Sequence, residues 1–359
     1  MKIFPTLRLR SFLSVLPMLL CAWCGLAQAQ VFDRLYRDSV APVLAQPLQW
    51  VAVDRDSIAS PDELERGKPL DFQDYTDHTV LPTSATREVW ARFALPPTTS
   101  LQSWFMRLPG QAVYRLSLYS RNPQGGWQMQ AAGQAIAPAQ WALRTRVPSF
   151  ELQTRGDTPQ VYYFRIEHHR AVTERPMLLS PVEYVDGASR VGVVIGLMWG
   201  TVALLTLLCL GAFALARNTV FLWFGALVVT LMAAQLVLIG YGSWRMWPNS
   251  AHLNQAMGWA SSFLAMAASA WFCTQASYTR SAHPRIHRLL AFIASVSLLL
   301  AGLTAVLPIE TISRDLRSLW MAFATLGVMG SLAWMSFRGQ AWNLLLLLGT
   351  AEGVKTLTR

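Results

Sequence analysis

Residues 191–216 read VGVVIGLMWGTVALLTLLCLGAFALA, a run of 26 residues without a charged side chain. A helix needs about 20 predominantly apolar residues to cross the hydrocarbon core of a bilayer, so this run predicts a membrane-spanning helix. Four further apolar segments follow it, at residues 220–240, 252–276, 289–309 and 319–337. Residues 190–349 are therefore predicted to form an α-helical transmembrane bundle embedded in a lipid bilayer.

A sixth apolar segment is shorter than the others. It covers residues 341–349, and nine residues are too few to cross a bilayer as a helix. The sequence then becomes polar, and we expect residues 350–359 (TAEGVKTLTR) to be an aberrant tail of the kind that a frameshift or an early stop produces. The sequence thus predicts five complete spans and one partial span.

Charge is distributed unevenly along the chain. Residues 30–189 hold 16 Lys and Arg against 17 Asp and Glu, whereas residues 190–359 hold 11 against 3. The net charge of +10 therefore arises mainly beside the apolar runs, where basic residues usually flank membrane spans. This placement argues against a nucleic-acid-binding protein, although a pI near 9.9 is typical of that class.

The first 29 residues have the three parts of a secretory signal peptide. An apolar segment at residues 12–26 precedes the small-x-small cleavage site Ala27-Gln-Ala29, and the basic start contains Lys2, Arg8 and Arg10. We expect residues 1–29 to be removed, which places residues 30–189 outside the cytoplasmic membrane. The alternative is an uncleaved anchor helix.

The loops between the spans favour the same orientation. If residue 189 lies outside, the inner loops contain no acidic residue and five basic ones, Arg217, Arg280, Arg285, Arg288 and Arg338. The outer loops carry both signs of charge: Arg245, Arg314, Arg317, Glu310 and Asp315. An excess of Lys and Arg on cytoplasmic loops is the usual rule. We therefore expect a multi-pass protein of the bacterial inner membrane with its N-terminal domain in the periplasm.

Residues 30–189 predict an all-β extracytoplasmic domain. Eight segments have strand composition and are bounded by turn-forming residues, at 49–53, 89–95, 103–108, 114–120, 126–131, 149–152, 161–167 and 177–185. Leu116 and Leu118 alternate with Ser117 and Tyr119, which is the period of two that is typical of a β-strand. Residues 122–126 (NPQGG) indicate a hairpin. Eight strands with little helix predict a sandwich or jelly roll, and we expect residues 61–82 to form a loop or a helical turn.

Motifs for catalysis are missing from the sequence. It has no phosphate-binding loop, dinucleotide-binding glycine motif, nucleophile elbow or His-Glu-x-x-His zinc motif. The four cysteines all lie in apolar segments, so the β domain has no disulfide or zinc framework. The predicted spans carry no acidic or basic residue at their centres, which argues against an ion transporter. We expect neither enzymatic activity nor a cofactor.

Aromatic and Arg side chains are frequent in the β domain. Exposed on a sandwich, they could bind a small ligand or a sugar. Alternatively, the aromatic rings could be core residues, covered by the aliphatic stems of the Arg side chains. The candidate ligand-binding residues are Trp90, Arg92, Arg107, Tyr119, Trp127 and Arg165.

Several segments of the chain resemble a known family. They are Val89-Trp-Ala-Arg-Phe93, Tyr114-Arg-Leu-Ser-Leu-Tyr119, Arg146-Val-Pro-Ser-Phe-Glu-Leu152, Tyr162-Tyr-Phe-Arg165 and Pro176-Met-Leu-Leu179, and the first span opens with Gly192 and Gly196. Together with the order of signal peptide, β domain and clustered spans, they resemble the bacterial seven-transmembrane receptors with diverse intracellular signalling modules. The type-2 extracellular domain of that family is a jelly roll similar to carbohydrate-binding modules.

The resemblance implies a role in signal transduction. The periplasmic domain would sense a small ligand, with carbohydrate as one candidate. The helices would relay the signal to a cytoplasmic output such as a diguanylate cyclase or a histidine kinase, which this sequence does not contain. A homodimer is also compatible with such a receptor. The alternative is a structural envelope protein whose β domain binds another protein.

Overall fold

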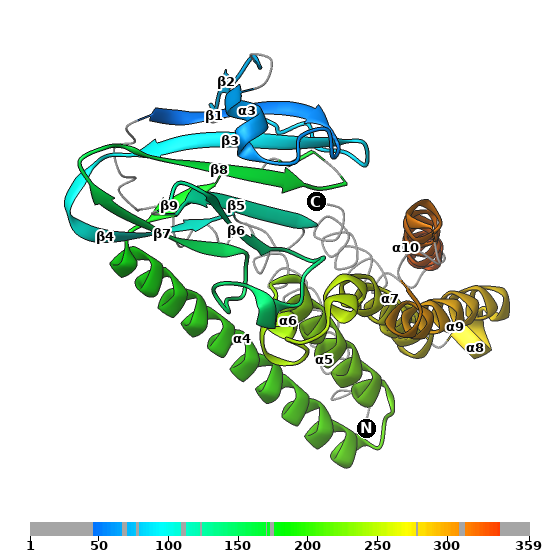
Figure 1. The fold of residues 1–359 in the computed structure, drawn as a ribbon. Coiled ribbons are helices and arrows are strands. Elements are labelled where there is room, and N and C mark those ends of the chain that lie inside the picture. Colours follow the sequence, from blue (N-terminus) through cyan, green and yellow to red (C-terminus); the bar gives the residue numbers. More distant parts are fainter. Residues whose placement is uncertain are drawn as a thin grey trace. The chain divides into compact units, whose positions relative to one another are not determined.

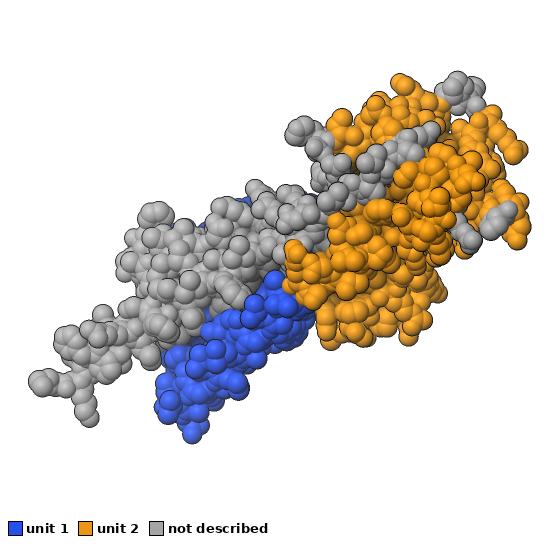
Figure 2. Space-filling model, turned by 90° about the vertical axis from the view of Figure 1, so that its left-hand side faces the viewer, with its two compact units in different colours: residues 1–31, 192–238, 256–359 blue, residues 32–191, 239–255 orange. Residues whose placement is uncertain are grey.

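The computed structural model describes residues 46–337, except 67–69, 77–78, 109–112, 123, 170, 173–175, 278 and 309–312. The predicted signal peptide, partial sixth span and tail lie outside the described residues. The chain divides into two compact units, shown in two colours in Figure 2. One unit contains the β domain up to Val191 together with residues 239–255, and the other contains residues 192–238 and the helical residues from Ala256 onward.

The β domain contains two antiparallel sheets (Figure 1). The larger sheet has the order β2-β1-β3-β8-β5-β6. Its strands are β1 (Gln46–Asp54), β2 (Gln73–Asp74), β3 (Arg87–Leu95), β5 (Arg115–Arg121), β6 (Trp127–Ala132) and β8 (Gln160–Glu167). The smaller sheet has the order β7-β4-β9, with β4 (Thr98–Arg107), β7 (Ser149–Gly156) and β9 (Met177–Leu179). All eight predicted strand segments contain a strand, and the two-residue β2 was not predicted.

The two sheets share one hydrophobic core. Phe93, Leu116 and Phe164 of the larger sheet pack in the same buried cluster as Met106 and Phe150 of the smaller sheet. Burial of apolar side chains between two sheets is the driving force for a sandwich. The structure therefore confirms the predicted all-β sandwich.

The larger sheet also buries side chains on its other face, which we call the outer face. Leu116 and Leu118 point into the core, whereas Tyr119 belongs to a second buried cluster that includes Val51 and Trp90. The segment between β1 and β2, which contains helix α3 (Pro61–Arg66), packs on this cluster through side chains such as Ile58, Leu64 and Phe72. The outer face is thus a covered surface on its β1–β3–β8 side.

One predicted strand is corrected by the structure. Residues 177–185 were expected to be extended, but β9 ends at Leu179 and helix α4 (Pro181–Ala216) begins two residues later. Ser180 and Glu183 form a capping box: the Glu183 N–H donates to Ser180 Oγ (3.3 Å) and the Ser180 N–H donates to Glu183 Oε2 (2.8 Å). This local signal, with Pro181 at the first helical position, overrides the strand composition.

Five helices of the described chain are long and apolar enough to cross a membrane. They are α4, α5 (Val220–Leu238), α7 (Ala251–Ala276), α9 (Pro284–Val306) and α10 (Arg314–Phe337). Each contains one of the five predicted complete spans almost entirely. Two short helices, α6 (Tyr241–Arg245) and α8 (Thr279–Ala282), lie in the connections.

Contacts between α9 and α10 are typical of membrane helices. The Trp320 indole N–H donates to Ser297 Oγ at 3.0 Å. A Cβ added at Gly327 would lie 2.7 Å from Ile293 Cδ1, so the glycine permits close approach of the two helices. Small residues and interhelical hydrogen bonds hold helices together where lipid offers no hydrophobic advantage.

Candidate functional site

Five of the six candidate ligand-binding residues lie on the outer face of the larger sheet. Trp90 and Arg92 are on β3, Arg165 is on β8, Tyr119 is on β5 and Trp127 is on β6. These strands are neighbours in the order β3-β8-β5-β6. Side chains at alternate positions of adjacent strands share one face, which explains why residues far apart in the sequence meet here.

Arg107 is the exception. It lies on β4 in the smaller sheet, opposite Ser149 on β7 and Met177 on β9. Its side chain is among the largest that are fully buried in the described chain. The structure therefore does not bring Arg107 to the outer face, because β4 belongs to the other layer of the sandwich.

The aromatic residues of the outer face contact one another in pairs. The rings of Trp90 and Tyr119 stack with their centroids 5.3 Å apart, and the rings of Trp127 and Tyr163 meet edge to face at 5.4 Å. Trp90 is 0% exposed, and Tyr119 and Tyr163 are also buried. Of the two interpretations of these aromatics, a core role therefore holds for Trp90 and Tyr119, whereas Trp127 is only partly buried.

A buried ion pair lies beside this aromatic cluster. Arg165 donates to Glu88 Oε2 from Nε at 2.9 Å and from Nη2 at 2.5 Å. The other carboxylate oxygen, Glu88 Oε1, accepts the Trp90 indole N–H at 3.0 Å. Glu88 is 0% exposed, so its charge depends on these donors for compensation.

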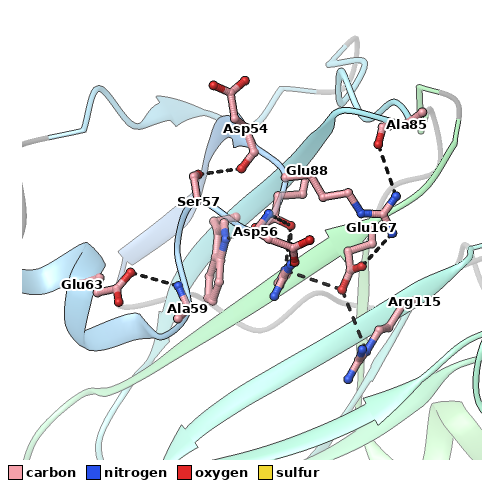
Figure 3. Close-up of polar contacts among 12 residues, drawn as sticks. Asp54, Asp56, Ser57, Ala59, Glu63, Ala85, Glu88, Arg115 and Glu167 are labelled. Atoms are coloured by element: carbon pink, nitrogen blue, oxygen red, sulfur yellow. Dashed lines mark hydrogen bonds and ion pairs between the residues drawn. The ribbon is translucent and has the colours of Figure 1, made fainter.

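The ion pair is part of a larger network (Figure 3). Glu88, Asp56 and Glu167 converge on the arginine side chains of the outer face. Arg165 also pairs with Asp56 at 2.5 Å, and Glu167 lies within 3.1 Å of Arg55 and 3.9 Å of Arg115. Three carboxylates thus balance three guanidinium groups, and through Arg55 and Asp56 they fasten the chain after β1 to strands β3 and β8.

The accessible end of the outer face has a different composition. Arg121 Cζ lies 4.8 Å from the centroid of the Trp127 ring, and Arg121 Nη2 pairs with Glu65 Oε2 at 2.5 Å. Both Arg121 and Glu65 are exposed. An aromatic ring, a guanidinium group and a carboxylate therefore lie together at the surface, and we call Trp127, Arg121 and Glu65 the surface triad.

Two family models match the chain. Residues 48–179 match the model described as 7TMR-DISM extracellular 2, and residues 192–351 match the model described as 7TM diverse intracellular signalling. Together the two matches cover the β domain and the helical region. The chain belongs to the 7TMR-DISM family. A comparison with curated proteins returns no match.

The two matched regions of this 7TMR-DISM protein are joined by a continuous helix. The extracellular match ends at Leu179 and the transmembrane match begins at Gly192, while α4 runs through both Gly192 and the preceding charged residues Asp186 and Arg190. Its 36 residues make a helix about 54 Å long, which exceeds the roughly 30 Å of a hydrocarbon core. The family assignment confirms the resemblance and makes the chain a multi-pass membrane protein of a receptor family.

Sequence reasoning missed Glu88 as a member of the site. A signal was present, since Glu88, Trp90 and Arg92 follow the period of two that places them on one face of β3. That signal does not identify Arg165 as the partner, because the pairing of β3 with β8 is not local.

Burial raises the pKa of Tyr119 and of Tyr163 above the ordinary 10.0, and it also raises the pKa of Tyr162. The pKa values of these tyrosines are higher in the folded state than in the unfolded state. The contribution of the neutral phenols to the free energy of unfolding is therefore complete below pH 10, and it is lost as the pH rises through the folded-state pKa values. We expect the β domain to lose stability above pH 10. We also expect these tyrosines to form phenolates at a higher pH than unburied tyrosines do. Pulse proteolysis in urea and ultraviolet absorbance across an alkaline titration would measure both effects.

A variant tests whether these phenols cause the alkaline transition. Tyr119→Phe should make the loss of stability above pH 10 smaller, because one buried phenol no longer has to ionise. Tyr114→Phe is the control, since Tyr114 lies outside the buried cluster of the outer face. An equal loss of stability above pH 10 in the unmodified chain, Tyr119→Phe and Tyr114→Phe would contradict the view that the buried phenols cause this loss.

Proposed function

We propose that this 7TMR-DISM protein senses a small ligand, with carbohydrate as one candidate, at the surface triad of its extracellular domain. The supporting observation is that Arg121 contacts both Trp127 and Glu65 at the accessible end of an aromatic face. Sugars stack their apolar faces on aromatic rings, and their hydroxyl groups need donors and acceptors such as guanidinium and carboxylate groups.

The environment of Trp127 supports this proposal. Its indole Nε1 is buried and has no hydrogen-bond partner among the described residues. A buried donor without an acceptor carries a free-energy cost of about 1–3 kcal/mol. A ligand whose binding uncovers this N–H and offers it a hydroxyl or carbonyl oxygen would remove the cost, which favours a polar ligand over a purely apolar one.

The relay and the location of the receptor are also part of the proposal. The basic loops and the signal-peptide pattern support an inner-membrane protein whose extracellular domain faces the periplasm. The helices would carry the signal to a cytoplasmic output of the diguanylate cyclase or histidine kinase type. Ligand binding can bias the helices only through different affinities for two conformations. A homodimeric receptor stays a prediction.

The binding proposal predicts a thermal shift. The full chain in lipid nanodiscs, mixed with neutral and acidic oligosaccharides in turn, should unfold at a higher temperature with at least one of them. A ligand at 100 times its Kd stabilises the folded state by about 2.7 kcal/mol. Trp127→Ala should abolish the shift because it removes the stacking ring.

Gln128→Ala is the matched control for this experiment. Gln128 is the next residue on β6 and is exposed, and adjacent residues of a strand point to opposite faces. The shift should persist in this variant. A shift that survives Trp127→Ala, or no shift with any oligosaccharide, would count against ligand sensing at the surface triad.

A further inference from the structure

Residues 239–255 lead from membrane helix α5 into the first residues of α7, yet they belong to the same compact unit as the β domain. We call them the α5–α7 connection. Their partners lie in residues 133–148, which join β6 to β7 and which we call the β6–β7 connection. The two connections are more than 90 residues apart in the sequence, so their contact is a property of the folded unit.

Hydrogen bonds join the two connections along their length. The Ala139 N–H donates to the Pro248 carbonyl at 2.8 Å, and the Trp244 indole N–H donates to the Arg144 carbonyl at 2.9 Å. Arg146 Nη1 donates to the Ile239 carbonyl at 2.5 Å. These bonds reach from the first residue of the α5–α7 connection to Pro248, so the contact is a continuous interface.

Asn254 extends the interface to the start of α7. Its Nδ2 lies 3.4 Å from the carbonyl oxygens of Gly133 and of Gln134. Donors from three side chains thus reach backbone carbonyls on the opposite connection. Because the acceptors are backbone carbonyls, these hydrogen bonds fix the main chain of one connection against the other connection.

The α5–α7 connection is compact in itself. Gly240 adopts a left-handed conformation (φ 80°), which turns the chain from α5 into α6. A Cβ added at Gly242 would lie 2.5 Å from Cη2 of Trp247, so the ring packs directly on this backbone. The segment is therefore a packed, ordered structure and not an extended linker.

The β6–β7 connection is anchored in the core of the sandwich. Gly133 follows β6 directly with a φ of 126°, and a Cβ there would lie 2.7 Å from the Tyr114 carbonyl oxygen. Trp141 is buried in the core and its indole N–H donates to the Ile136 carbonyl at 3.1 Å. The strand that carries Trp127 is thus continuous with a tightly packed segment that holds the α5–α7 connection.

We infer that the β6–β7 connection is a docking surface for the α5–α7 connection, so that the extracellular domain holds the outer ends of α5 and α7 as well as α4. The surface fits a segment of this same chain. A displacement of β6 would reach α5 and α7 through it. The relay of a ligand signal by this route rests on the proposed function, whereas the docking itself does not.

Hydrogen exchange of the full chain in lipid nanodiscs tests the docking without a ligand. Arg146→Gln removes the charged donor to the Ile239 carbonyl, and Trp244→Phe keeps a ring but removes the donor to Arg144. A single hydrogen bond to a charged group corresponds to a change of about tenfold or more in an opening equilibrium. We expect amide exchange across residues 239–255 to accelerate by about tenfold in Arg146→Gln and by roughly two- to tenfold in Trp244→Phe, which loses a neutral hydrogen bond, with β3 and β8 unchanged.

Arg144→Gln is the matched control. The Arg144 side chain is exposed, and the residue takes part in the interface through its backbone carbonyl, which the substitution retains. Exchange in residues 239–255 should be unchanged in this variant. Unchanged exchange in Arg146→Gln and Trp244→Phe, or equal acceleration in Arg144→Gln, would overturn the docking inference.

An oligosaccharide that produces the thermal shift described above tests the relay separately. It should change the exchange of amides at the ends of α5 and α7 in the unmodified chain. In a chain with both Arg146→Gln and Trp244→Phe, that change should disappear while the thermal shift persists. If no oligosaccharide raised the unfolding temperature of the unmodified chain, only ligand sensing would be refuted. The exchange experiment without ligand decides the docking by itself.

Discussion

Replacing Arg165 with Ala is expected to lower the free energy of unfolding of the β domain by about 3–5 kcal/mol. Arg165 supplies two donors to the Glu88 carboxylate, and Glu88 is fully buried. Without the guanidinium group, the carboxylate retains the Trp90 indole N–H but loses its compensating charge. Pulse proteolysis of the full chain in nanodiscs at increasing urea concentration would measure the loss.

Arg121→Ala is the matched control, because it makes the same substitution on the same sheet face. The Arg121 side chain is 48% exposed and its partner Glu65 is 31% exposed, so solvent screens the pair. Exposed pairs contribute about 0–1 kcal/mol. Equal effects of Arg165→Ala and Arg121→Ala would contradict a special role for the buried pair. Arg165→Lys should fall between them, since it keeps the charge and loses the fork of two donors.

Replacing Trp90 with Ala is expected to lower the free energy of unfolding by about 3–5 kcal/mol. The indole is fully buried, stacks on Tyr119 at 5.3 Å and donates to Glu88. Its removal leaves a cavity between the sheet and the segment that contains α3, and it removes one donor from a buried carboxylate. The same urea series followed by pulse proteolysis would detect the change.

Trp127→Ala separates a core role from a ligand-binding role. Trp127 lies on the same face but is only partly buried, so we expect its removal to cost less folding free energy than that of Trp90. If Trp127→Ala destabilised the domain as strongly as Trp90→Ala, the surface triad would be a structural element. The combination of small destabilisation and lost thermal shift would support its role in sensing.

The transmembrane region and most of the strands could be predicted from the sequence. Hydrophobic transfer depends on composition over about 20 successive residues, so runs such as residues 191–216 identify spans without any tertiary information. Strand periodicity is equally local, which is why Leu116 and Leu118 were correctly placed on one face of their strand and Tyr119 on the other. The start of α4 was missed because the capping box of Ser180 and Glu183 competes with a neighbouring strand pattern.

The two-part architecture, the membrane spans and the residue types of the outer face follow from local sequence patterns. The folded chain is needed to show which of those residues meet, that Trp90 is covered while Trp127 is only partly buried, and that Arg107 lies in the other sheet. The reason is that local periodicity sets the face on which a side chain lies. Strand order and the packing of distant connections set its partners, and both depend on contacts between residues that are far apart in the chain.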